Sequence, residues 1–258
     1  MILPLKERLK KAASLVGGVS SCKKTGRPPE SIVADVGCDH AYLSLYLVLT
    51  GRCREAIASD IRPGPLSAAS QNIRRYGCEE KIHTLLTDGL AGIEAYSPTD
   101  IVICGMGGDT IIAILKDALF VKKQGMRLIL QSMTGTAELA LYLAAEGFRL
   151  TAERYALEGK KSYRILAAVY EGEPYELPAA DALTGRLFFE EDREAYREYF
   201  QKVIRTIRKK IGGYPNGHPN SLYLCELLSE LLKKESALPS LPAAKLPSVH
   251  ACPDPGAK

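Results

Sequence analysis

The stretch IVADVGCDHAYL, residues 32 to 43, decides the fold that we expect for this chain. Its apolar start, residues 32 to 34, is too short for a helix and is typical of a buried parallel strand. Gly37 permits positive φ, and residues 41 to 49 have the pattern of a helix that follows the turn. A strand, a glycine turn and a helix form the first crevice of a doubly wound α/β sheet, where nucleotide-like ligands bind. We therefore expect an adenosine-containing cofactor there.

The acids of this turn distinguish between two cofactors. A dinucleotide fingerprint needs glycine at three places, but Asp39 and Tyr42 occupy the later two. A carboxylate at Asp39 would repel a pyrophosphate, whereas S-adenosylmethionine carries no phosphate and has an ammonium group with which a carboxylate can pair. Asp35 or Asp39 therefore favours S-adenosylmethionine over NAD. The alternative is that both acids only cap the turn and the next helix.

Three later segments repeat the arrangement of an apolar strand followed by a polar turn. Residues 56 to 60 end in Asp60, at the position where a carboxylate accepts hydrogen bonds from ribose hydroxyls. Residues 81 to 86 precede Asp88 and Gly89, which suit an adenine amino group and a flat ring. The carboxyl ends of parallel strands share one edge of a sheet, so these groups should lie together. The fourth strand, residues 101 to 104, runs into a glycine-rich turn made of Gly105, Met106, Gly107 and Gly108.

These motifs resemble one known family. VADVGCDHAYL, DIRPGPL (60 to 66), DGL (88 to 90), GMGG (105 to 108) and LILQ (128 to 131) are similar to the bacterial tRNA (adenine-N1)-methyltransferases that modify adenine 22. The resemblance covers roughly residues 1 to 170 and continues more loosely beyond. It implies a Rossmann-like class I methyltransferase domain, S-adenosyl-L-methionine as the cofactor, tRNA as the substrate, and a C-terminal coiled-coil domain implicated in tRNA binding.

The chain also departs from the family pattern. Ser44 and Ser132 stand where proline is usual, and Arg164 follows Tyr163 where an acid is common. The basic loop from 17 to 31 resembles an insertion, either a solvated linker or a contact to RNA phosphate. These departures leave the cofactor site untouched and concern the target-base pocket. The resemblance and the turns together predict cofactor contacts from Asp35, Gly37, Cys38, Asp39, His40, Asp60, Ile61, Asp88, Gly89, Leu90 and Gly105.

The expected reaction needs little acid–base chemistry. N1 of adenine carries an in-plane lone pair, so no strong general base is required, and the site has to align N1, methyl and sulfur. N1 lies on the Watson–Crick edge, so the base must be unpaired or flipped. The residues predicted for the target pocket are Gly105, Met106, Gly107, Gly108, Gln131 and His40.

Each of these residues also has a structural interpretation. The glycines could serve only a tight strand-to-helix turn, and Gln131 could be an ordinary strand-end amide. His40 orients Asp39, lines the pocket or has a structural partner at a helix start. Tyr155 or Tyr163 stacks on the base or belongs to the core.

Composition sets the broad class. The chain has 258 residues, 46% of them apolar, and a net charge of only +4, so an RNA-binding surface must be local. Seven scattered cysteines without a CxxC pair argue against a zinc site and predict reduced thiols in the cytoplasm. Cys104 is expected as a small residue beside the pocket. No apolar run approaches the roughly 18 residues of a membrane span. We expect a monomer without an obligate protein partner.

The chain divides into three parts. Residues 1 to 172 are expected to form the catalytic domain, with an N-terminal helix within 5 to 16, strands at 127 to 130, 150 to 157 and 162 to 170, and a helix at 139 to 146. The last two strands should form an antiparallel hairpin. Residues 173 to 235 carry apolar stripes at 196 to 211 and 224 to 232, which predict an antiparallel helical hairpin. The proline-rich tail, 236 to 258, is expected to be disordered.

The first helix of this hairpin has acidic residues near its start and basic residues near its end. Acids stand early, at 190 to 194, and cations stand late. Helix-dipole placement alone explains this order. The alternative is that the basic end contacts the tRNA backbone through Arg205, Arg208, Lys209 and Lys210.

Other functions remain open. A class I methyltransferase with another RNA or a small molecule as acceptor would use the same turns. A non-catalytic RNA- or nucleotide-binding module is the alternative from a different class. An NAD oxidoreductase is disfavoured because two fingerprint glycines are missing.

Overall fold

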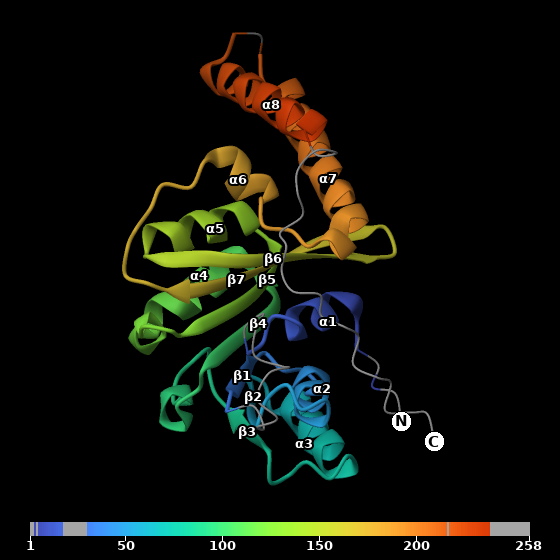
Figure 1. Ribbon diagram of the computed structural model, residues 1–258, viewed down its shortest axis with the longest axis vertical. Helices are drawn as coiled ribbons and strands as arrows, with labels where there is room; N and C mark the ends of the chain where they lie inside the picture. The colour runs from blue at the N-terminus through green and yellow to red at the C-terminus, as the bar shows by residue number, and fades with distance from the viewer. Residues whose placement is uncertain (1–2, 4, 18–29, 216, 238–258) are drawn as a thin grey trace.

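Parallel strands alternate with helices in the first half of the chain and build a seven-stranded sheet in the order β3-β2-β1-β4-β5-β7-β6. The computed structural model describes residues 3, 5 to 17, 30 to 215 and 217 to 237. Figure 1 shows the sheet with helices on both faces. The strands are β1 Ile32–Val36, β2 Glu55–Asp60, β3 Ile82–Leu86, β4 Asp100–Gly107, β5 Arg127–Thr134, β6 Phe148–Glu158 and β7 Lys161–Tyr170.

The helices fall into two groups. Those of the sheet domain are α1 Glu7–Ala13, α2 Tyr42–Leu49, α3 Pro63–Arg75, α4 Gly108–Asp117 and α5 Thr136–Ala145. The later ones are α6 Ala179–Thr184, α7 Arg193–Gly212 and α8 Pro219–Ala237, and short 3₁₀ turns span Ile93–Tyr96, Leu119–Lys122 and Glu190–Asp192.

Alternation along the strands produces two apolar layers. Val33 of β1 packs in the same cluster as residues of α1, α2 and α3, whereas its neighbour Ala34 packs with residues of α4 and α5. Successive side chains of a strand point to opposite faces, and a strand covered on both faces reads as a continuous apolar run. The predicted α/β fold class is therefore confirmed, including the antiparallel β6–β7 hairpin at the sheet edge.

The prediction of a glycine-rich turn at 105 to 108 is wrong in detail. β4 continues through Gly107, which pairs with Thr134 of β5 after two irregularities in the register. Gly108 then begins α4 directly. A Cβ at Gly108 would lie 2.4 Å from the carbonyl oxygen of Gly135, so this glycine is required by packing.

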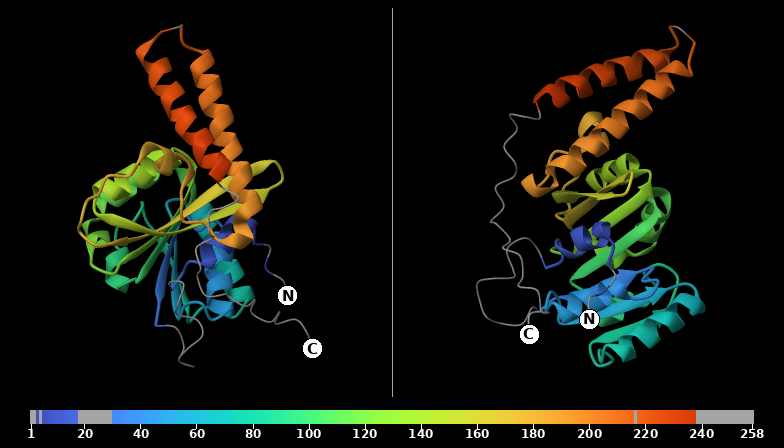
Figure 2. Two further views of the ribbon diagram at one scale, coloured as in Figure 1. Left: turned by 45° about the horizontal axis from the view of Figure 1, so that its top comes forward. Right: turned by 90° about the vertical axis from the view of Figure 1, so that its right-hand side faces the viewer.

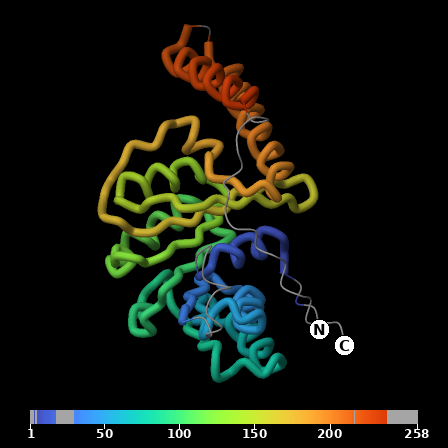
Figure 3. The backbone as a smooth tube through the Cα atoms, in the orientation of Figure 1, coloured from blue at the N-terminus to red at the C-terminus, as the bar shows by residue number. Residues whose placement is uncertain are grey.

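The second apolar region forms the predicted helical hairpin. α7 and α8 lie side by side and project beyond the sheet domain (Figure 2). Buried residues of both helices, including Phe200, Ile204 and Leu231, share one cluster with Tyr155 of β6. Figure 3 traces the chain from this hairpin back to the strands that support it. Of the tail expected at 236 to 258, all but the first two residues lie outside the described part of the chain, as do residues 18 to 29 of the basic loop.

A buried ion pair connects the edge strands to this helical part. Arg164 of β7 is almost fully buried and its Nε lies 3.1 Å from the Glu153 carboxylate of β6. Burial alone would lower the pKa of Arg164, but Glu153 holds it above its usual value. Arg164 also donates to the carbonyl oxygens of Asp181 and Ala182 in α6. Arg164, which departs from the family pattern, thus has a structural role: it holds α6 in place.

Tyr155 belongs to the same cluster, which corrects one expectation. Its side chain is fully buried, and its hydroxyl shares its one proton between the Glu153 carboxylate at 2.7 Å and the carbonyl oxygen of Thr184 at 2.8 Å. Stacking of Tyr155 on a substrate base is therefore excluded, and its alternative role in the core is confirmed.

A second buried network joins the N-terminal helix to the start of α7. Asp192 accepts hydrogen bonds from Lys11 of α1 at 2.6 Å, and from the Arg154 side chain and the Tyr155 backbone of β6. Asp192 is nearly inaccessible to solvent. This acid therefore does more than complement the helix dipole, because it joins three elements.

The structure shows a role for Ser44, another departure from the family pattern. Its hydroxyl donates to the carboxylate of Asp35 at 2.7 Å, joining α2 to β1 inside the domain. Burial raises the pKa of Asp35 from its ordinary value of 3.8 to about 6, against the opposing hydrogen bonds from Ser44.

Arg164→Met should lower the free energy of unfolding by about 3–5 kcal/mol, because it leaves the Glu153 carboxylate buried without its cation. Urea denaturation provides the measurement. The matched control is Arg149→Met, which removes an arginine from the same sheet edge whose ion pair with Glu171 is half exposed. A similar loss in both variants would contradict the importance of the buried pair.

Asp35→Asn should change the pH dependence of stability. A raised pKa in the folded state means that the contribution of Asp35 to stability is full below about pH 4 and is lost as the pH rises through about 6. One pKa unit corresponds to about 1.4 kcal/mol, so above pH 7 the asparagine variant should be the more stable by roughly 3 kcal/mol. Urea denaturation between pH 4 and 8 measures this difference, and a difference independent of pH would refute it.

Candidate functional site

The carboxyl edge of the sheet holds a cavity of about 330 Å³. The parallel registers align the ends of β1, β2, β3 and β4, so that Val36 lies opposite Ser59 and Ile103, and Asp60 opposite Leu86. The cavity is lined by most of the residues predicted for the cofactor, namely Gly37, Asp39, Asp60, Ile61, Asp88, Gly89 and Gly105. Met106, which is predicted for the target pocket, also lines it, together with Arg62, Cys104 and Thr110.

The first glycine turn is shaped by contacts to two strands. The N–H groups of Gly37 and Cys38 both donate to the carbonyl oxygen of Ser59 at 2.9 Å. Gly37 has a φ of +73°, and a Cβ there would lie 2.4 Å from the terminal methyl of Met106. The left-handed φ favours glycine at this position, whereas the Met106 methyl is the end of a flexible side chain that can move aside. The turn is thus a cradle beside which the Met106 side chain lies.

Three of the acids at this edge, Asp35, Asp39 and Asp60, differ in accessibility. The side chain of Asp39 is 70% exposed and borders the cavity. Asp60 is buried, and one of its carboxylate oxygens accepts a hydrogen bond from the Arg62 N–H at 2.9 Å. Asp35 lies behind the turn and does not line the cavity. Of the two acids considered for an ammonium group, Asp39 is therefore the one that a ligand reaches directly.

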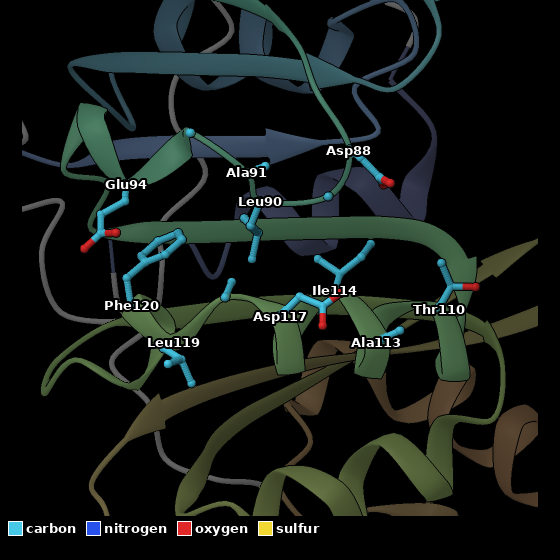
Figure 4. Close-up of a pocket in the computed structure, with 13 residues that line it drawn as sticks. Asp88, Leu90, Ala91, Glu94, Thr110, Ala113, Ile114, Asp117, Leu119 and Phe120 are labelled. Atoms are coloured by element: carbon cyan, nitrogen blue, oxygen red, sulfur yellow. The ribbon is translucent and has the colours of Figure 1, made fainter.

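A larger cavity of about 720 Å³ adjoins the first. Figure 4 shows it between the loop after β3, which carries Leu90 and Ala91, and the helix α4, which carries Ile114 and Asp117. The two cavities share Asp88, Gly89, Thr110 and Ile114. A Cβ at Gly89 would lie 3.3 Å from the Ile114 side chain, so the shared wall is closely packed. Three carboxylates, from Asp88, Glu94 and Asp117, line the larger cavity.

Besides Asp35, three predicted cofactor residues do not line the 330 Å³ cavity. Leu90 faces the larger cavity, and Cys38 is buried beside the turn. The ring of His40 is exposed, and its Nε2 lies 3.6 Å from the Asp39 carboxylate. The roles predicted for these residues stay predictions.

The two cysteines near the site are neutral thiols. Burial raises the pKa of the Cys104 thiol to about 12 and that of Cys38 further still. Neither is therefore a thiolate at neutral pH.

The target side of the site contains one residue that the sequence interpretation missed. Arg8 of α1 donates from Nε to the Gln131 side-chain oxygen at 3.1 Å and from Nη1 to Glu158 at 3.0 Å. Its guanidinium lies 5.6 Å from the centre of the Tyr163 ring, and Nη2 lies 3.9 Å from where a Cβ of Gly105 would be. Gln131 itself is fully buried, and its amide nitrogen donates to the Ser132 carbonyl oxygen.

Arg8 thus holds the amide of Gln131 with its oxygen towards α1. In the sequence, Arg8 is one of several cations on an amphipathic helix, and no local signal separates it from its neighbours.

The four cations proposed for RNA binding lie apart from the cavities. Arg205, Arg208, Lys209 and Lys210 are exposed on α7, and within the described residues none has an ion-pair partner.

In the same described part of the chain, no group of three His, Cys, Asp or Glu residues is arranged to hold a metal ion. Across the described helices, none has the length and apolar character needed to cross a membrane.

Known proteins resemble this chain in sequence and in fold. The chain is 36% identical over 144 residues to the tRNA (adenine(22)-N(1))-methyltransferase of Bacillus subtilis, an alignment that spans 55% of this chain and 59% of that protein. A solved structure of the B. subtilis M1A22 tRNA methyltransferase TrmK has a TM-score of 0.66 at 25% identity, covering 93% of this chain and 99% of that chain. A Streptococcus pneumoniae protein solved in complex with S-adenosyl-L-methionine has a TM-score of 0.70 at 30% identity, covering 88% and 97%.

These similarities confirm the resemblance noted from the motifs. A family model described as a methyltransferase domain matches residues 5 to 166, which is more than half of the chain. The protein therefore belongs to the methyltransferase domain family.

Proposed function

We propose that this protein transfers a methyl group from S-adenosyl-L-methionine to N1 of adenine 22 in tRNA. The observation that carries the proposal is the cavity at the carboxyl edge, where a glycine cradle and accessible acids meet the exposed backbone of Gly105. The B. subtilis relative is a tRNA (adenine(22)-N(1))-methyltransferase, and the S. pneumoniae neighbour binds S-adenosyl-L-methionine. Both relationships support the same reaction.

The residues at the cavity suit the proposed cofactor. Its sulfonium centre supplies an electrophilic methyl group. The exposed carboxylate of Asp39 pairs with the ammonium group, and Asp60 at the end of β2 accepts hydrogen bonds from the ribose hydroxyls. Asp88 and Gly89 hold the adenine ring against the wall formed by Ile114. The absence of a phosphate-binding glycine after Gly37 fits a cofactor without phosphate.

The target base is positioned by the exposed backbone of Gly105, beside which Arg8 is held. Gly105 has a φ of +87° and is exposed, so a flat ring can approach its peptide group closely. Gln131 is fully buried and does not reach the base directly; its oxygen accepts a hydrogen bond from Arg8 and holds that guanidinium beside Gly105. The carbonyl oxygen of Gly105 accepts from the exocyclic amine of adenine and leaves the N1 lone pair free. Alignment of N1 with the methyl group is then the main contribution of the protein.

The remaining roles follow from this reaction. The exposed cations of α7 bind the tRNA backbone, and the protein acts in the cytoplasm as a monomer without an obligate protein partner. His40 holds the carboxylate of Asp39 at the rim of the cavity.

Unmodified tRNA transcripts, labelled S-adenosyl-L-methionine and nucleoside mass spectrometry test the proposal. We expect 1-methyladenosine with wild-type tRNA and none when adenine 22 is replaced. Asp60→Ala should weaken cofactor binding about 10- to 100-fold in calorimetry, because a hydrogen bond to a charged group is lost. Asp117→Ala, in the neighbouring cavity, is the matched control and should bind normally. Cofactor binding without transfer to any tRNA would show that the acceptor is another molecule.

Replacement of Arg205, Arg208, Lys209 and Lys210 by Gln should weaken tRNA binding and reduce its salt dependence. Each lost phosphate contact lowers the slope of log affinity against log salt by about 0.7 to 0.9, so four contacts correspond to a change of roughly 3. Filter binding between 50 and 200 mM salt measures it. The control variant neutralises Arg74, Arg75, Lys81 and Lys116, which lie outside α7. An equal change in both variants would assign the effect to net charge.

A further inference from the structure

A third cavity of about 300 Å³ lies between the carboxyl end of β5 and the helix α7. We call it the junction cleft and define it by Met133, Thr134, Tyr163, Tyr199 and Lys202, which are among its lining residues. Its volume is at the lower end of the range for ligand pockets. The Met133 side chain is 43% exposed there, and the ring of Tyr163 is half buried. The cleft therefore offers apolar and aromatic surface of the kind on which a base stacks.

Gly107, the last residue of β4, lies between the junction cleft and the proposed cofactor cavity. A Cβ at Gly107 would lie 3.5 Å from the Thr134 hydroxyl, which belongs to the cleft, and 3.6 Å from the Thr110 hydroxyl, which belongs to the cofactor cavity. Gly107 and Gly105 carry no side chains that would close the space between the two cavities. A base held in the cleft can therefore present one edge towards the cofactor.

Lys202 supplies a cation at the opening of the cleft. Its side chain is exposed, its Nζ lies 3.4 Å from the Ser162 carbonyl oxygen and 5.7 Å from the centre of the Tyr199 ring. Within the described residues it has no carboxylate in ion-pair contact. Arg205 and Lys209 follow three and seven residues later and so share its face of the helix. The three cations form a row of about 10 Å that leads from the cleft along α7.

The other approach to the site is unfavourable for RNA. The 720 Å³ cavity carries the carboxylates of Asp88, Glu94 and Asp117, which repel phosphate groups. The junction cleft contains Glu138 at the start of α5, but its opening is bordered by Lys202. An anionic strand is therefore attracted to the cleft and repelled from the larger cavity.

We propose that the junction cleft receives the nucleotide whose base is methylated, with its base in contact with Met133 and Tyr163 and its phosphate on Lys202. The inference rests on the proposed function and adds to it the route by which RNA enters. It also adds Lys202 to the four basic residues proposed above.

The first test compares Lys202→Gln with Lys233→Gln, which removes the same charge from an exposed site on α8. Lys202→Gln should raise KM for tRNA about 10-fold and lower the salt slope of binding by about 1, because one charged contact to phosphate is lost. The kcat at saturating tRNA and the affinity for S-adenosyl-L-methionine should stay unchanged. Lys233→Gln should behave as wild type. Identical behaviour of the two variants would overturn the inference.

The second test uses fluorescence and needs no turnover. The chain contains no tryptophan, so Met133→Trp places a single reporter in the cleft. Leu119→Trp, at a side chain that is 77% exposed beside the acidic cavity, is the matched reporter. Unmodified tRNA should quench the emission at position 133 and leave that at 119 unchanged.

The outcomes separate the two proposals. Quenching at 119 alone, or equally at both positions, would overturn the cleft assignment even if adenine 22 is methylated. Quenching at 133 without methyl transfer would retain the cleft as an RNA site and reject the proposed reaction.

Discussion

The ion pair between Arg164 and Glu153 is the interaction on which the arrangement of the two parts of the molecule depends. Neither charge reaches solvent, and the arginine also donates to backbone oxygens of Asp181 and Ala182. Lys234 of α8 binds the carboxylate of the same Asp181 at 2.6 Å. A continuous chain of charged contacts therefore runs from the edge strands through α6 to the helical hairpin. Because a buried charge without its partner is costly, these contacts favour the observed placement of the hairpin over the sheet.

Much of the fold and of the cofactor side could be predicted because both depend on local pattern. Parallel strands end at one edge, so acids such as Asp60 and Asp88 that follow apolar runs must come together. The helix α3 is less visible in the sequence, because only Ala69 and Ile73 of its residues are buried, although Pro63 at its first position is a typical helix start. The continuation of β4 through Gly107 depends on pairing with Thr134, a partner 27 positions away that no local pattern identifies.

The target side could not be predicted for the same reason. Arg8 acquires its role from Gln131 and Glu158, which are more than 120 positions away in the chain. Tyr155 and Tyr163 lie on neighbouring strands and look alike in the sequence, yet the helical hairpin buries the first and leaves the second beside the junction cleft. Which tyrosine is available follows from where α7 packs, and this in turn is set by the buried charges of β6 and β7.

The two sides of the carboxyl edge differ in charge. The net charge of +4 is too small to attract RNA from every side, and the cations proposed for RNA binding are exposed on α7. Carboxylates line the cavity on the opposite side of the proposed cofactor. A polyanion is therefore drawn to the side of β5 and excluded from the side of β3, while a small cation such as the proposed cofactor is favoured near the acids. The two substrates would reach the methyl-transfer point from opposite sides of Gly105, each attracted by the charge that repels the other.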